Sequence, residues 1–155
     1  MIASFSAWYL KLPDAERFFS LLLWLAAAGH FVVLIASFQV PSRLHWKEDL
    51  KQLAPFNRKL MWVYGGFTVF TIIAFGLLTL ALHDELLRGD RAALALALFI
   101  GVYWTLRIVV EFFYYEPAGW PQGQSMVAGR ILLTLLFIYL AGSNLALFSW
   151  QVLAR

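Results

Sequence analysis

Four long apolar stretches, separated by shorter polar ones, form the pattern of this chain. The apolar stretches cover about residues 17–40, 60–82, 92–115 and 130–151. Each is close to the roughly 20 residues that an α-helix needs to cross the hydrocarbon core of a bilayer. Backbone polar groups in lipid must be satisfied within their own segment, which favours helices. The pattern therefore predicts an all-α integral membrane protein, an antiparallel four-transmembrane-helix bundle in which residues 1–155 form a single membrane domain.

Prolines and short polar runs mark the ends of these spans. Pro13, followed by acidic residues, predicts the start of the first helix, because proline and negative charge are both favoured in a first turn. Pro41 is expected to end that helix. The polar run 83–91 is short, and we interpret it as a turn that makes the second and third spans neighbours. Residues 116–129, rich in glycine and proline, are expected to form a loop.

Two shorter segments are predicted to lie at the membrane surface. Residues 1–12 are apolar and aromatic but too short to span, and they lack the basic region and cleavage site of a signal peptide. We expect them to remain as an interfacial segment. Within 43–54, Trp46, Leu50 and Leu53 recur at helical spacing with charges between them. This spacing predicts a short amphipathic helix between the first two spans, able to dock on the membrane or on a partner.

Composition supports a membrane domain and limits its chemistry. Hydrophobic residues make up 62% of the 155 positions, against about 45–50% in an average soluble domain. The chain has no cysteine, which excludes disulfides, thiolate metal ligands and a cysteine nucleophile. Its net charge of +3 is not gathered into a basic stripe, so no nucleic-acid partner is expected. The expected partners are membrane lipids and other membrane subunits or further copies of the chain.

Positive charge favours one orientation of the four spans. The face of the two chain ends would carry Lys11, Arg17, Arg88, Arg91 and Arg155, and the opposite face Arg43, Lys47, Lys51, Arg58, Lys59 and Arg130. Basic residues concentrate in cytoplasmic loops, which predicts a cytoplasmic 41–59 loop. The runs Ser42-Arg-Leu-His-Trp-Lys-Glu-Asp-Leu and Pro55-Phe-Asn-Arg are similar to segments of small bacterial membrane proteins. That resemblance implies the bacterial inner membrane.

Arg107 and Glu111 form the strongest functional signal in the chain. They lie four residues apart within the otherwise apolar third span. Charges at such a depth are costly, and they persist where they pair, face the bundle interior or contact something polar. Their spacing suits an internal salt bridge that fixes helix packing, and Glu111 can also snorkel to the interface. A ligand or partner site is the functional alternative.

Other polar and aromatic residues are expected near this pair. At about 1.5 Å of rise per residue, Tyr64 falls in the same half of the membrane, with His30 close to the midplane. Trp104 shares the face of the third helix that carries Arg107 and Glu111. These five residues are the predicted ligand- or partner-binding candidates, in a pocket open toward the 41–59 loop. A membrane lipid is the expected ligand, with Arg107 holding an anionic head group.

His30 suggests a cofactor as a further alternative. Ala26-x-x-x-His30 resembles the alanine–histidine spacing of bacterial light-harvesting polypeptides, in which histidine holds bacteriochlorophyll. That resemblance implies that His30 is an axial ligand to a tetrapyrrole, either bacteriochlorophyll or haem. A bis-histidine haem would need a partner chain, because His45 and His83 lie near the ends of spans. The other interpretation is a neutral histidine that bonds a neighbouring helix.

These features leave hypotheses from different classes. The first is an accessory or structural subunit of a larger respiratory or photosynthetic membrane complex, which it stabilises through helix packing and the amphipathic loop. The second is a small membrane enzyme, or a lipid- or isoprenoid-binding protein, that uses the cavity around Arg107, Glu111 and His30. A tetrapyrrole-binding subunit is the third. The sparse chemistry favours a role without catalysis, and no residue is assigned as catalytic.

Overall fold

The computed structural model describes residues 13–115 and 123–154. Over these residues the chain is helical, without β-strands. The four long helices are α2 (Pro13–Arg43), α4 (Pro55–Ala81), α6 (Arg91–Phe113) and α7 (Gln124–Leu153). The short ones are α3 (Trp46–Asp49), η1 (Leu50–Gln52) and α5 (His83–Arg88). Each long helix is long and apolar enough to cross a membrane, which confirms the prediction of an all-helical integral membrane protein with four candidate spans.

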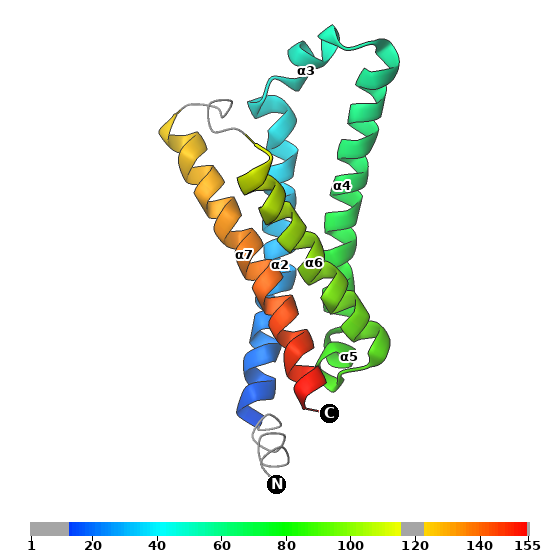
Figure 1. Cartoon of the computed structure of the whole chain (residues 1–155), viewed down its shortest axis with the longest axis vertical. Helices are drawn as coiled ribbons and strands as arrows, with labels where there is room; N and C mark the ends of the chain where they lie inside the picture. Colours follow the sequence, from blue (N-terminus) through cyan, green and yellow to red (C-terminus); the bar gives the residue numbers. More distant parts are fainter. Residues whose placement is uncertain (1–12, 116–122, 155) are drawn as a thin grey trace.

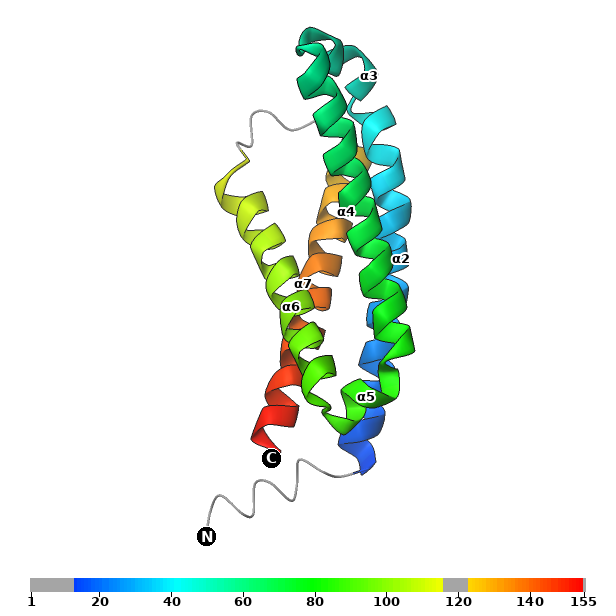
Figure 2. The ribbon, with the colours of Figure 1, turned by 90° about the vertical axis from the view of Figure 1, so that its right-hand side faces the viewer.

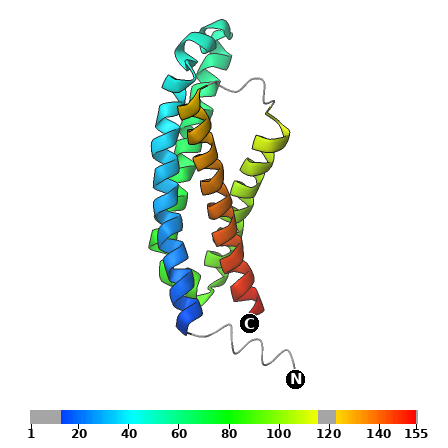
Figure 3. The same ribbon diagram turned by 90° about the vertical axis from the view of Figure 1, so that its left-hand side faces the viewer.

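The long helices lie roughly along one axis, and the chain reverses direction from each to the next (Figure 1). α2 packs against both α4 and α7, and α6 packs chiefly against α7. One end of the molecule holds α5, the first residues of α2 and the last residues of α7, and the other end holds α3 (Figure 3). α4 and α6 diverge toward the α3 end (Figure 2). The predicted interfacial segment 1–12 and the first part of the 116–129 loop lie outside the described residues.

Two helix boundaries differ from the predicted ones, both at prolines that flank the segment between α2 and α4. The prediction that Pro41 ends the first helix is wrong, because α2 continues to Arg43. Proline removes one backbone donor and crowds the carbonyl four residues earlier, but within a last turn this leaves the rest of the helix intact. α4 begins at Pro55 rather than near residue 60, since proline is favoured in a first turn. The predicted turn at 83–91 contains a short helix, α5.

The segment between α2 and α4 forms two short pieces rather than one amphipathic helix over 43–54. Leu50 is 8% exposed whereas Leu53 is 39% exposed, so the predicted docking residues do not share one outward face. Trp46 is half-buried and packs on α4. Its ring lies edge-on to that of Trp62, with 5.8 Å between the ring centroids. The segment therefore closes over the end of the α2–α4 pair.

Two buried clusters hold the helices together. One joins α2, α4, α6 and α7 and includes Phe75, Trp104 and Phe137. The other joins α2, α5, α6 and α7 and includes Leu86 and Leu147. Because lipid tails are as apolar as these side chains, close packing rather than escape from water stabilises such contacts between membrane helices.

Gly101 allows α6 and α7 to approach closely. A Cβ at this position would lie 2.7 Å from Cγ of Leu145 and 3.3 Å from its backbone nitrogen. We expect Gly101→Ala to lower the free energy of unfolding by about 1–3 kcal/mol, because the added methyl group must push the helices apart. Denaturant titration in mixed micelles measures this change. Gly142→Ala is the matched control, since a Cβ there meets nothing within 4 Å. Equal stability of the two variants would contradict the expected close packing.

Candidate functional site

Glu111 lies at the centre of a polar network between α6 and α7. Its side chain is 3% exposed. Oε1 accepts hydrogen bonds from Thr134 Oγ1 at 2.7 Å and from Arg130 Nε at 3.3 Å. Oε2 lies 3.8 Å from Arg107 Nη1. The predicted Arg107–Glu111 ion pair is therefore present, but the hydrogen bonds to the carboxylate come from α7. Such bonds to a buried charge tie the two helices together.

His30 is fully buried and engages both ring nitrogens. Nδ1 lies 2.7 Å from the carbonyl oxygen of Ala26, to which it donates. Nε2 then accepts a hydrogen bond from the indole Nε1 of Trp104 at 3.1 Å. Both bonds assign the same neutral tautomer. Axial ligation of a tetrapyrrole would require one of these bonds to break, so this geometry favours the alternative of a histidine that bonds a neighbouring helix.

An apolar crevice lies between the four long helices, in the half of the molecule nearer α3. Its volume is about 190 Å³. Its polar and aromatic lining residues are Ser37 of α2, Thr68 of α4, Tyr103, Trp104 and Arg107 of α6, and Phe137 of α7. The remaining lining residues are aliphatic and come from α2, α4 and α7. We call this site the Arg107 crevice. Its lining residues belong to the half of the bundle in which α4 and α6 diverge (Figure 2).

Arg107 lines this crevice, and its guanidinium makes an ion pair and a cation–π contact but no close hydrogen bond through Nη1 to another described residue. Its Cζ lies 5.1 Å from the centroid of the Phe137 ring, a cation–π distance. Nη1 is buried and has no hydrogen-bond partner among the described residues, because the 3.8 Å to Glu111 exceeds hydrogen-bond length. Buried donors without a partner are costly and uncommon in proteins. The crevice is therefore lined by an arginine whose buried Nη1 has no hydrogen-bond partner in the described part of the chain.

The structure brings some of the predicted site residues together and separates others. Arg107 and Trp104 line the crevice. Glu111 pairs with Arg107, and His30 bonds Trp104. Tyr64 is 59% exposed and is not among the residues that line the crevice, so the structure does not bring it to the other four. The depth of a residue follows from its position along a helix, but its direction depends on how the helix packs.

Two residues of the site carry too little sequence signal to be predicted. Tyr103 lines the crevice beside Arg107, and their i, i+4 spacing was the available hint. Arg130 bonds Glu111, although it lies 19 residues further along the chain. At the start of the fourth span it is readily interpreted as an ordinary flanking charge.

Among the described residues, no group of three or more His, Asp or Glu side chains is arranged to hold a metal ion. The described part of the site thus consists of a buried ion network, a buried His–Trp bond and a crevice with a cationic wall. Comparison of the chain with protein-family models, curated proteins and solved structures finds no match.

Proposed function

We propose that the protein binds a membrane amphiphile with an anionic head group in the Arg107 crevice. The observation that carries this proposal is the buried Nη1 of Arg107, which lacks a hydrogen-bond partner within residues 13–115 and 123–154. A phosphate or carboxylate oxygen is the acceptor that guanidinium groups bind best. In a site shielded from water, such a charge-assisted bond is about twice as strong as a neutral one.

The position of the crevice suits a lipid-like molecule. Arg107 lies six residues before the end of α6 at Phe113, or about 9 Å along the helix. An anionic group at this depth is within reach of the head-group region, since arginine side chains extend toward the interface. The apolar lining can accept part of a hydrocarbon chain. Because 190 Å³ is below the roughly 300 Å³ of the smallest typical ligand pockets, the rest of the chain would lie in the bilayer.

We place the protein in the bacterial inner membrane as an antiparallel four-span bundle, with residues 1–12 at the interface and the 41–59 loop in the cytoplasm. The basic residues of that loop support this orientation. The Arg107 crevice then faces the cytoplasmic leaflet, because it lies in the half of the bundle nearer α3. The ligand would be drawn from that leaflet.

We propose as a second possibility that the chain is an accessory subunit of a larger membrane complex, or a homo-oligomer. The supporting observation is that His30 and Glu111 are both engaged in bonds between helices. Deeply placed polar groups that hold helices together favour a structural role over acid–base catalysis at these positions. The amphiphile would then be a lipid bound within the complex.

Arg107→Gln is expected to weaken retention of the anionic amphiphile by at least about tenfold, because a hydrogen bond to a charged group contributes about 1.5–3 kcal/mol. Glu111 keeps its bonds to Arg130 and Thr134, so the fold should persist. The measurement is native mass spectrometry of protein extracted mildly from its own membrane.

Arg88→Gln is the control for this experiment, since Arg88 is exposed and pairs with Glu85 and Asp90 at the far end. Equal retention by both variants would overturn the ligand site. A spectrum that shows additional protein subunits but no amphiphile would support the accessory-subunit proposal instead.

A further inference from the structure

A second polar cluster lies at the opposite end of the molecule from the Arg107 crevice. Ser20 of α2 and His83 of α5 are 63 residues apart in the chain, and Ser20 Oγ lies 3.2 Å from His83 Nε2. His83 Nδ1 lies 3.2 Å from Asp84 Oδ1. When Nδ1 donates to the carboxylate, Nε2 is left as an acceptor for the serine hydroxyl. This is the connectivity of a serine nucleophile, its general base and the group that orients the base.

We propose that Ser20 is a nucleophile that His83 activates to cleave an ester bond of a membrane glycerophospholipid. The site is independent of the Arg107 crevice. Ser20 and His83 are its catalytic residues, and Asp84 is a positioning residue.

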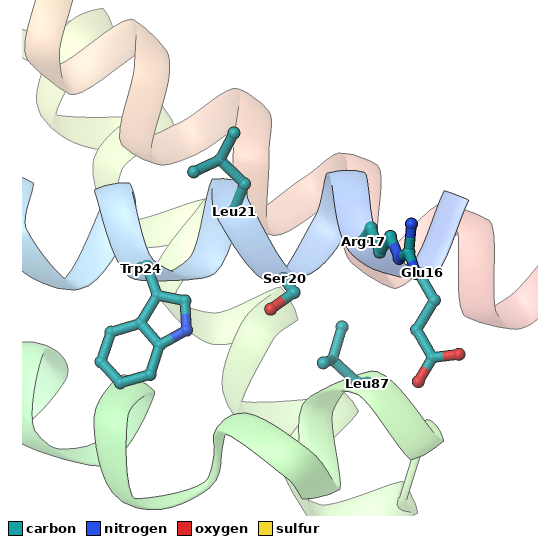
Figure 4. Close-up of a pocket in the computed structure, with 6 residues that line it drawn as sticks. All are labelled: Glu16, Arg17, Ser20, Leu21, Trp24 and Leu87. Atoms are coloured by element: carbon teal, nitrogen blue, oxygen red, sulfur yellow. The ribbon is translucent and has the colours of Figure 1, made fainter. Parts of the chain in front are cut away.

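An open groove beside Ser20 provides room for such a substrate. The groove lies between α2 and α5 and has a volume of about 510 Å³. It is lined by Glu16, Arg17, Ser20, Leu21, Trp24 and Leu87. Ser20 and Trp24 project from α2 toward α5, and Leu87 faces them (Figure 4). The Trp24 ring also lies beside that of His83, with 5.1 Å between their centroids, so the base contacts two of the residues that line the groove, Ser20 and Trp24.

The order of residues along α2 matches the order of groups in a glycerophospholipid. Ser20 is seven residues from the start of α2, about 10 Å along the helix, and Arg17 is nearly one turn closer to that start. Trp24, 54% exposed, lies one turn deeper. A phosphate bound by Arg17 would place the ester bonds near Ser20 and the acyl chains along Trp24. Glu16 adds a negative charge to the groove, which favours a head group with an ammonium, as in phosphatidylethanolamine.

The reaction follows from these positions. Ser20 Oγ attacks the ester carbonyl carbon while its proton passes to His83 Nε2, and the carbon–oxygen bond to the glycerol breaks. The same proton moves from His83 to the departing glycerol oxygen, which releases a lysophospholipid and leaves an acyl group on Ser20. Water, deprotonated by His83, then cleaves the acyl-serine to a fatty acid and returns the proton to Ser20. Arg17 is the cationic group in the groove that can stabilise developing negative charge.

The test is covalent labelling of the full chain in phosphatidylethanolamine vesicles with a fluorophosphonate, which reacts with activated serines. We expect an adduct on Ser20, located by mass spectrometry, and release of fatty acid from the vesicles. Ser20→Ala should abolish both. His83→Gln should slow labelling by about 100-fold or more, because general-base catalysis typically contributes that much.

Three further variants separate catalysis from packing. Ser143→Ala is the matched control, because Ser143 of α7 is buried, lies outside both sites and donates its hydroxyl to the Leu140 carbonyl. It should label at the wild-type rate. Asp84→Asn should slow labelling by at least about tenfold, because it weakens the contact that orients His83. It should not lower the unfolding temperature, because Asp84 is exposed. Asp84→Glu should restore the labelling rate. An unlabelled wild-type Ser20, or equal labelling rates in wild type and His83→Gln, would overturn the proposal.

Discussion

Replacing Glu111 by alanine is expected to lower the free energy of unfolding by about 3–5 kcal/mol, because it removes a buried carboxylate that accepts two hydrogen bonds from α7, and hydrogen bonds to a charged group contribute about 1.5–3 kcal/mol each. The carboxylate accepts hydrogen bonds from Arg130 and Thr134 and pairs with Arg107. Its removal breaks the contacts that join α6 to α7 near the α3 end. Titration with denaturing detergent, followed by circular dichroism, measures the change.

Glu85→Ala is the control for the Glu111 experiment. Glu85 forms its ion pair with Arg88 at the surface, where the arginine side chain is 60% exposed, and such pairs typically contribute only about 0.2–1 kcal/mol. If Glu111→Ala were no more destabilising than Glu85→Ala, the network would not stabilise the bundle. The carboxylate would then be available for another role.

The Trp104→Ala substitution is expected to have an effect of similar size, a loss of about 3–5 kcal/mol of unfolding free energy. Trp104 is 2% exposed and stacks on Phe137 with 4.9 Å between ring centroids. Its removal creates a cavity in the main cluster and leaves Nε2 of His30 without its donor. Thermal and denaturant unfolding in the same detergent provide the measurement.

Trp104→Phe separates the two contributions at this position. Phenylalanine keeps most of the ring volume but cannot donate to His30, so a smaller loss of about 1–3 kcal/mol is expected. Phe113→Ala, at a position that is 87% exposed, controls for loss of an aromatic ring. A Trp104→Phe variant as stable as wild type would show that the His30 bond contributes little to stability.

The number and approximate place of the spans could be predicted from the sequence because hydropathy is a local property. A helix in lipid satisfies its own backbone groups, so an apolar stretch of sufficient length is enough to predict it. The boundaries were less certain because proline acts differently at the two ends of a helix. Pro55 begins α4, whereas Pro41 is accommodated in the last turn of α2.

Sequence reasoning also selected Arg107 and Glu111 as candidates, since charge inside an apolar span is visible without a structure. It could not identify their environment. Glu111 is held by Arg130, 19 residues away. Tyr64 is exposed and does not line the crevice near which its depth placed it. Spacing along a helix gives depth, but rotation about the helix axis is decided by packing against neighbours.

The sequence by itself therefore determined that this chain is a helical membrane protein with a charged pair in its third span. Tertiary structure alone decided which polar groups meet. His30 bonds Trp104 across 74 positions of the chain, and Ser20 meets His83 across 63. Such contacts depend on the rotation and tilt of whole helices, which arise from the sum of many weak packing interactions. No local pattern in the sequence contains that sum.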